Sequence, residues 1–231
     1  MQMADPSRAA QVPSLTELAL TDSHLRERGF SREPLLNGRM LRVVRDAVVL
    51  PNSEHAAREY VIHPGAVMII PMLDDGRVVL ERQFRYPTGQ TMIEFPAGKL
   101  DQGEGSLSCA RRELREETGL EAQEWAYAGV LHPVISYSTE HIDIWFARGL
   151  TGGERHLDAG EFLDVFAATP TELMGWSYEG KVTDAKTLVA TLWLHNVLNG
   201  TWRLNWFSGD APEGQHPSPS GPYQPTLTAR P

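Results

Sequence analysis

Hydrophobic residues recur along the chain at two spacings, one typical of helices and one typical of strands. Leucine, valine and tryptophan at intervals of three and four residues predict an amphipathic helix over residues 183–198. Short apolar runs rich in β-branched residues, bounded by turn residues such as Gly76, predict strands. The predicted strands cover residues 39–50, 59–63, 66–72, 78–84, 125–130, 141–147 and 162–167. Strands and helices mixed in this way indicate an α+β fold.

The two ends of the chain do not follow this pattern. Residues 1–30 are polar and weakly patterned, so we expect a mobile N-terminal arm. Residues 208–231 hold six prolines and three glycines, too many to sustain a helix or a strand, and we expect a disordered tail. Between them we expect an N-terminal strand region at 31–60 and a main domain at 61–207.

Composition and charge restrict the classes of partner. The chain of 231 residues has a formal net charge of −9, and its 21 lysines and arginines form no cluster, which argues against non-specific binding to nucleic acid. The longest apolar run, residues 66–73, is far shorter than the ~20 residues of a membrane helix, and residues 1–10 lack the apolar core of a secretory signal. The one cysteine, Cys109, fits a reducing compartment, so we expect a cytoplasmic protein without a membrane partner.

The most distinctive stretch is residues 98–120, which has glycine near both ends and four glutamates between them. Glu113 and Glu117 are four residues apart, so on a helix both carboxylates project from one face, with Glu116 one position round. The dipole of a helix disfavours carboxylates near its C-terminus by about 0.3–1 kcal/mol each, and a cation would reverse that penalty. Oxygen ligands of this kind suit Mg²⁺ or Mn²⁺.

A run of charged residues on a helix is more often only a solvated face. Here the glycines at both ends and the additional Glu104 favour a metal site. Arg112 lies four residues before Glu116, and we expect it to orient the glutamates rather than to take part in catalysis. Cys109 lies between the apolar and polar faces, and we expect a small half-buried side chain rather than a nucleophile.

The spacing of these residues resembles a known motif. From Gly98 to Leu120 it matches the Nudix box, Gly-x5-Glu-x7-Arg-Glu-U-x-Glu-Glu-x-Gly-U, in which U is aliphatic. The resemblance implies a Nudix α/β/α sandwich with a mixed β-sheet, preceded here by the N-terminal β-strand region.

The sequence around the box is similar to that of the ADP-ribose pyrophosphatases within the Nudix hydrolases. The similar segments are HPGAV at 63–67, RQFRYP at 82–87, IEFPAGKL at 93–100 and GKVTDAKT at 180–187. Residues 131–140 resemble the Ser-Pro-Gly-type loop of that family, although Val134 and Ile135 stand where a glycine is expected. The resemblance covers residues 39–200. It implies hydrolysis of ADP-ribose to AMP and ribose 5-phosphate by a homodimer in which the N-terminal region reaches the partner.

The resemblance also implies which residues hold the metal. The ligands would be the backbone carbonyl of Ala97 and the carboxylates of Glu113 and Glu117, with Glu116 variably involved as a ligand or a catalytic group. The ion would be Mg²⁺, with Mn²⁺ as the alternative. Such ions neutralise a diphosphate, hold it in line and lower the pKa of a bound water that attacks phosphorus.

A carboxylate outside the box would accept the proton of that water or orient it. The family takes this residue from a loop after the box, and Glu161 between Gly160 and Phe162 resembles it. Glu154 and Asp158 are its rivals, and an exposed loop acid before a strand is the alternative interpretation of Glu161.

Three residues before the box are candidates for binding the substrate. Arg85 maps to a family arginine that contacts the diphosphate or the ribose, and the guanidinium fork suits those oxygens. Glu94 resembles a family glutamate near the terminal ribose; alternatively, it is a strand residue paired with a neighbouring arginine. Arg82 either binds the substrate or lies on the surface of a strand. The candidates for an aromatic partner of the base are Phe30, Phe84, Tyr86 and Trp125.

Two alternative functions are consistent with the same fold. GDP-mannose or another nucleotide sugar is an alternative substrate for the same chemistry. A catalytically idle Nudix-fold sensor that binds a nucleotide should have lost box carboxylates and gained a partner module, and the sequence shows neither change.

Overall fold

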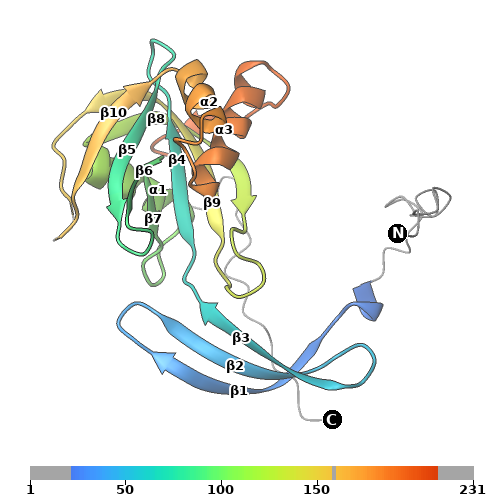
Figure 1. The fold of residues 1–231 in the computed structure, drawn as a ribbon. Coiled ribbons are helices and arrows are strands. Elements are labelled where there is room, and N and C mark those ends of the chain that lie inside the picture. Colours follow the sequence, from blue (N-terminus) through green and yellow to red (C-terminus); the bar gives the residue numbers. More distant parts are fainter. Residues whose placement is uncertain (1–21, 158–159, 213–231) are drawn as a thin grey trace, which may run out of the picture. The chain divides into compact units, whose positions relative to one another are not determined.

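The computed structural model describes residues 22–157 and 160–212 (Figure 1). These residues fall into two compact units. The first unit consists of residues 22–33 and 45–59, and the second of residues 34–44, 60–157 and 160–212. The whole of the box therefore lies in the second unit.

The N-terminal part of the chain forms a three-stranded sheet in the order β1-β2-β3. It contains the short 3₁₀ helix η2 (Asp22–His24) and the strands β1 (Arg28–Asn37), β2 (Arg42–Val49) and β3 (His55–Ile62). Arg32 on β1 binds both carboxylate oxygens of the buried Asp46 on β2, at 2.7 and 2.9 Å. Such a two-pronged pair fixes the position of one strand beside the other. Strand β1 is not among the predicted strands, because most of its side chains are exposed and no apolar run marks it.

The second unit is built on two further sheets (Figure 1). A five-stranded sheet has the order β11-β8-β9-β4-β7, in which β4 and β9 are parallel and the other neighbours are antiparallel. An antiparallel three-stranded sheet has the order β10-β5-β6. The strands are β4 (Ala66–Pro71), β5 (Val78–Arg85), β6 (Gln90–Glu94), β7 (Ala97–Lys99), β8 (Leu120–Leu131), β9 (Ile142–Gly152), β10 (Leu163–Ala168) and β11 (Phe207–Ser208).

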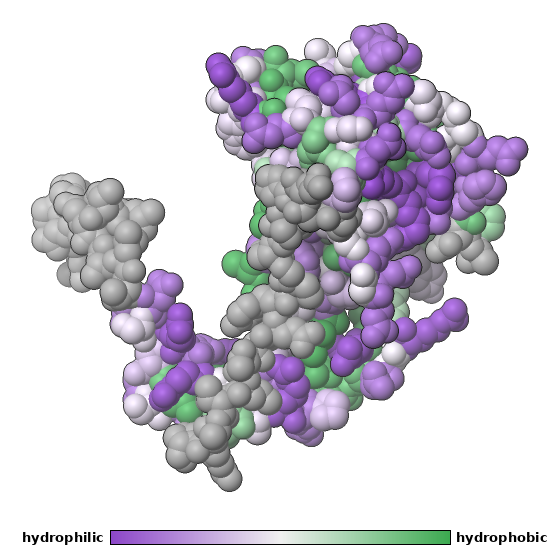
Figure 2. Space-filling model, turned by 180° about the vertical axis from the view of Figure 1, so that it is seen from behind, coloured by the Kyte–Doolittle hydropathy of each residue, from purple (hydrophilic) through white to green (hydrophobic). Residues whose placement is uncertain are grey.

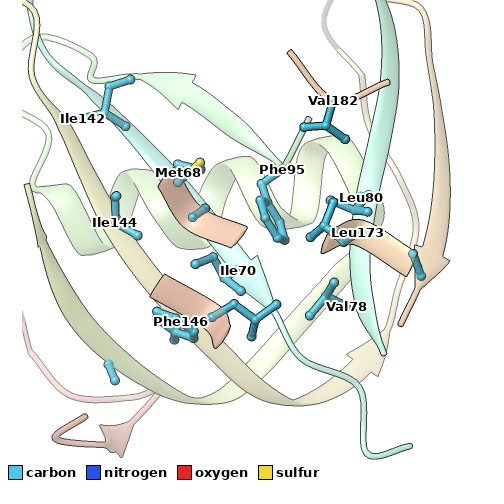
Figure 3. Close-up of a cluster of buried hydrophobic side chains, with 14 of the residues drawn as sticks. Met68, Ile70, Val78, Leu80, Phe95, Ile142, Ile144, Phe146, Leu173 and Val182 are labelled. Atoms are coloured by element: carbon cyan, nitrogen blue, oxygen red, sulfur yellow. The ribbon is translucent and has the colours of Figure 1, made fainter. Parts of the chain in front are cut away.

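Three helices cover the mixed sheet, namely α1 (Ser106–Thr118), α2 (Pro170–Tyr178) and α3 (Ala185–Leu198). Every residue of β4 is buried, and its alternate side chains enter two separate cores. Val67 and Ile69 pack with Leu107 and Leu114 of α1. Met68 and Ile70 enter the other core, which Figure 3 shows together with Phe95, Phe146 and Leu173 of α2. The mixed sheet is thus sandwiched between helices, and the predicted α+β sandwich is present.

The periodic segments are found close to their predicted positions. The helix predicted at 183–198 is α3, whose N-cap Asp184 accepts a hydrogen bond from the backbone N–H of Thr187 at 2.9 Å. Helix α2 was not predicted, although its start carries a capping box between Thr169 and Glu172. Strand β9 runs to Gly152, beyond the end of the strand predicted at 141–147.

The structure describes only the inner parts of the predicted arm and tail. Residues 1–21 and 213–231 lie outside the described residues. The strand β11 includes Ser208, the first residue of the predicted tail, because Phe207 pairs with Trp125 on β8 and packs its ring against Trp145. Ser208 thus lies one residue beyond the expected boundary at 207.

Polar side chains predominate on the face of the molecule shown in Figure 2, and hydrophobic ones lie between them in small groups. Within the part of the chain that the structure describes, no helix is long and apolar enough to cross a membrane.

We expect Gly65→Ala to destabilise the fold markedly. Gly65 has φ +99°, and a Cβ placed there would lie 2.6 Å from the ring of His141 and 2.8 Å from Leu100 Cδ1. Left-handed strain of about 1–2 kcal/mol and overpacking of about 1–3 kcal/mol should together lower the free energy of unfolding by ~2–5 kcal/mol. Urea unfolding followed by circular dichroism measures this change.

Gly76→Ala is the matched control for the steric part of that effect. Gly76 also has a positive φ, +85°, but a Cβ there meets nothing within 4 Å. The free energy of unfolding of Gly76→Ala should fall by only ~1–2 kcal/mol, the cost of the left-handed strain alone. Equal losses in the two variants would contradict the steric argument.

Candidate active site

Helix α1 carries the box glutamates and is fixed at both ends by glycines. Its C-cap Gly119 adopts the left-handed conformation, with φ +72°, and donates its N–H to the carbonyl of Arg115. The apolar side chains of Leu107, Ala110 and Leu114 are fully buried and orient the helix. Glu113 and Glu117 are buried as well, although they are charged residues. The predicted sharing of one helical face by these two glutamates is therefore present.

A cleft of about 530 Å³ lies in front of these glutamates. One wall is acidic, with Glu113, Glu116, Glu117 and Glu161. The cations Arg85 and Lys186, from β5 and α3, also line the cleft. A larger hollow of about 820 Å³, between α1 and β8, contains none of the acidic wall. The smaller cleft is therefore the candidate site.

The start of the box fits closely around the carboxylates. The backbone N–H of Ala97 donates a hydrogen bond to Glu117 Oε2 at 3.0 Å. A Cβ at Gly98 would lie 1.8 Å from Glu113 Oε1, so only glycine leaves room for that carboxylate in its present position. Strand β7 thus brings the backbone of Ala97 and Gly98 directly against the two helical glutamates, which the spacing alone does not reveal.

Arg112 holds the glutamates of the box in place. It binds both oxygens of Glu104 at 2.8 Å and reaches Glu113 and Glu116 at 2.7 and 3.1 Å. The Arg112 guanidinium holds the pKa of Glu104 at about 2, well below its usual range. These contacts agree with the predicted orienting role of Arg112. Cys109 is fully buried rather than half-buried, and burial raises the pKa of its thiol.

The carboxylates on the floor of the cleft repel one another. Burial, followed by the charges of Glu81, Glu113 and Glu161, raises the pKa of Glu117 to about 10. Burial and the charges of Glu161 and Glu94 raise the pKa of Glu81 to about 8. Burial also raises the pKa of Glu113. The site therefore favours any group that brings positive charge.

Glu81 was not predicted as a site residue. It is the first polar residue after the buried run of β5, and a carboxylate at that point of a buried strand is the signal that could have identified it. Its side chain is only 3% exposed, and its Oε1 has no hydrogen-bond partner among the described residues. An unpaired buried carboxylate oxygen is costly unless a cation or a proton compensates it.

These carboxylates fit a divalent cation. Mg²⁺ and Mn²⁺ prefer carboxylate and carbonyl oxygens, and the cleft offers Glu113, Glu116, Glu117 and the backbone of Ala97. Within the described ranges, no three acidic, histidine or cysteine side chains already form a ready-made cage. Arg112 binds Glu113 and Glu116 by ion pairs, so an incoming ion would compete with Arg112 for these carboxylates.

Arg85 and Lys186 meet at one buried carboxylate. Arg85 donates from Nε and Nη2 to the two oxygens of Glu94, at 2.6 and 2.8 Å. Lys186 pairs with the same Glu94 and with Asp184 at 3.0 Å. These contacts match the alternative interpretation of Glu94, a strand residue paired with an arginine. Lys186 was not predicted as a site residue, because only the fold brings α3 beside β5 and β6.

The remaining candidate residues differ in whether they line the cleft. Arg82 is exposed beside Asp164, at 3.8 Å, and strand alternation turns it away from the face that carries Arg85. It does not line the cleft, so its predicted contact with the substrate gains no support. Glu161 lines the cleft and accepts a hydrogen bond from Gln83 at 3.4 Å. Its rival Glu154 has a 93% exposed side chain, and Asp158 lies outside the described residues.

The four aromatic candidates for stacking on a base differ in exposure. Trp125 is a core residue, 1% exposed. Phe30 packs on His55 in the N-terminal sheet, with 5.3 Å between the ring centroids. Phe84 and Tyr86 are exposed at the end of β5 and beyond it. Both adjoin Arg85 in the sequence, but strand alternation turns Phe84, like Arg82, away from the face of β5 that carries Arg85.

Comparison with known proteins identifies the family. The chain matches the model of the NUDIX domain over residues 62–191. It is 34% identical over 172 residues to the ADP-ribose pyrophosphatase of Bacillus subtilis (strain 168), which covers 74% of this chain and 93% of the relative. It is 36% identical over 172 residues to the methanol dehydrogenase activator of Bacillus methanolicus, with 73% and 92% covered.

A further relative and a solved structure agree with this match. The ADP-ribose pyrophosphatase of Mycobacterium tuberculosis (strain ATCC 25618 / H37Rv) is 32% identical over 180 residues, with 74% of this chain and 84% of the relative covered. The crystal structure of an ADP compounds hydrolase shares the fold, with a TM-score of 0.69 and 24% identity over 78% of this chain and 98% of that one. Box, fold and relatives agree: the chain belongs to the Nudix hydrolase family.

Proposed function

We propose that this protein is a metal-dependent hydrolase that cleaves the diphosphate bond of ADP-ribose or a related nucleoside diphosphate sugar, giving AMP and a sugar phosphate. The observation that carries the proposal is that one cleft is lined by the box glutamates together with Arg85 and Lys186. A diphosphate bears negative charges that suit both a cation held by the glutamates and the two basic side chains. Two relatives that share about a third of their residues with this chain are named ADP-ribose pyrophosphatases.

The glutamates of the box would hold the metal. Glu113, Glu117 and the carbonyl of Ala97 are the proposed ligands, with Glu116 as a variable ligand or catalytic group. A bound Mg²⁺ or Mn²⁺ supplies charge neutralisation of the diphosphate and acidifies water. Arg112 keeps Glu113 and Glu116 pointing into the cleft through its ion pairs.

Glu161 would complete the chemistry. Its carboxylate accepts the proton of the water that attacks phosphorus, while the P–O bond to the departing phosphate group breaks. Arg85 would bind the non-bridging oxygens of the diphosphate with the guanidinium edge that Glu94 leaves free. Glu161 and Arg85 both line the cleft, which supports this division of roles.

A hydrolysis panel tests the proposal. The purified chain with Mg²⁺ is offered ADP-ribose, GDP-mannose, diadenosine polyphosphates and NADH, and the products are separated by ion-exchange chromatography. We expect AMP and ribose 5-phosphate from ADP-ribose at the highest kcat/KM. Faster cleavage of GDP-mannose would reassign the substrate within the same chemistry. Cleavage of none of the four would refute the hydrolase and favour the nucleotide-binding sensor.

We also propose that the protein is a homodimer in the cytoplasm. The segment 34–44 exposes Leu35, Leu36, Met40 and Leu41, and apolar side chains gathered on a surface favour a protein partner. Cys109 is a buried free thiol, which suits a reducing compartment. Size-exclusion chromatography with light scattering should give about twice the chain mass at micromolar concentration, and a monomer would contradict the dimer.

We expect Glu94→Gln to raise the KM for ADP-ribose about tenfold and to change kcat less. Glutamine keeps the shape of the side chain but cannot bind Arg85 through two charged oxygens, so the guanidinium loses its fixed orientation. Steady-state kinetics at saturating Mg²⁺ measures both constants. Arg82→Gln is the matched control on the other face of β5 and should change neither constant by more than about twofold.

A further inference from the structure

Glu81 differs from every other carboxylate near the cleft in its surroundings. It lies directly opposite Glu94 in the pairing of β5 with β6, so the two side chains share one face of the sheet. Two like charges facing each other across strands destabilise a sheet unless they are compensated. Arg85 and Lys186 compensate Glu94. Glu81, in contrast, is 3% exposed, and its Oε1 has no partner among the described residues.

The neighbours of Glu81 place it under the acidic wall. Gln83 lies two residues further along β5 on the same face, and its amide donates to Glu161. Glu161 therefore lies over the face of β5 that carries Glu81. Glu94, which pairs with Glu81 across the strands, lies three residues before Ala97, and the backbone N–H of Ala97 binds Glu117. Strand β5 thus supplies a carboxylate near Glu117, in addition to the carboxylates that α1 supplies.

Such an arrangement has an energetic cost that the fold does not recover by itself. Burying a carboxylate without a partner costs several kcal/mol in general, and glutamine or leucine would avoid that cost at this position. The hydrogen bond from Ala97 satisfies Glu117 Oε2, whereas no described residue satisfies Glu81 Oε1. A divalent cation beside both groups would compensate the two charges at once.

We propose that Glu81 is an additional ligand for a divalent cation, at a position it shares with Glu117. The inference rests on the proposed function only in that the cation is the one the hydrolase uses. It adds a ligand from β5 to those offered by α1 and β7.

Manganese titration of the full-length, substrate-free protein tests this ligand. After removal of metal with EDTA, free Mn²⁺ is followed by electron paramagnetic resonance for the wild type and for Glu81→Gln. Loss of a metal ligand or its close support weakens binding about 10- to 100-fold, and we expect a loss in this range. Glu81→Met, which fills a similar volume without a polar atom, should show the same loss and serves if the glutamine variant does not fold.

Thermal unfolding distinguishes a metal ligand from a structural carboxylate. Without metal, Glu81→Gln should melt at a higher temperature than the wild type, because the wild type must either bury the charge of Glu81 or keep that carboxyl protonated, whereas glutamine is neutral in both the folded and the unfolded state. Added Mn²⁺ should then stabilise the variant less than the wild type. A merely structural Glu81 predicts the opposite, a variant that melts lower with and without metal.

Asp143→Asn is the matched control, since Asp143 is 1% exposed and accepts a hydrogen bond from Tyr127 at 3.2 Å, outside the acidic wall. It should bind Mn²⁺ like the wild type. Binding by Glu81→Gln within twofold of the wild type would overturn the inference, even if the wild type hydrolyses ADP-ribose. Weaker Mn²⁺ binding by Glu81→Gln in a protein that cleaves none of the panel would support the ligand and refute the proposed substrate.

Discussion

Glu117→Gln should lower kcat/KM for ADP-ribose by about a thousandfold, which corresponds to ~4 kcal/mol of transition-state stabilisation. Glu117 is 4% exposed and lies among Glu81, Glu113 and Glu161. We therefore expect its main contribution to catalysis to be the binding of a cation. The amide of glutamine keeps one oxygen but carries no charge, and it binds Mg²⁺ far more weakly. The fold should survive, because the amide oxygen can still accept the hydrogen bond from Ala97.

Three measurements check this prediction. Steady-state kinetics at several Mg²⁺ concentrations should show that excess metal restores only part of the activity. Circular dichroism should show an unchanged fold, and thermal unfolding without metal should show no loss of stability, because glutamine does not have to be protonated to be buried at this position. Glu121→Gln, on the exposed start of β8, is the control and should keep full activity. Wild-type activity in Glu117→Gln would remove Glu117 from the metal site.

The part of the site that one helix builds could be predicted from the sequence. Glu113 and Glu117 lie on one face because the spacing of four residues fixes their relation on any helix. The nearby apolar residues Leu107, Ala110 and Leu114 fix which face is turned inward. Helical periodicity is local, so no knowledge of the rest of the fold is needed.

The part that depends on strand pairing could not be predicted. Glu81 meets Glu94 only through the register of β5 with β6, and Lys186 reaches Glu94 only because α3 packs beside those strands. A register shift of one residue would turn Glu81 to the other face. The same alternation explains why Arg82 does not line the cleft: its neighbours in the sequence are site residues, but its own side chain faces the other way.

Glu161→Gln should lower kcat for ADP-ribose by about 10²–10⁴-fold and leave KM within about threefold, because a group that accepts a proton acts in the transition state and not in binding. The loop position of Glu161 alone leaves several acids possible. The structure supplies the selection, since Glu161 lines the cleft and accepts a hydrogen bond from Gln83, while the Glu154 side chain is 93% exposed.

Glu154→Gln is therefore the matched control from the same loop, with the same change of charge. It should keep kcat within about twofold of the wild type, as surface substitutions usually do. A large loss in Glu154→Gln with none in Glu161→Gln would exchange the two roles, and would mean that the loop closes differently over a bound diphosphate. Similar large losses in both variants would instead show that the proton acceptor acts through a network of loop acids, because a single acceptor would make only one of the two substitutions costly.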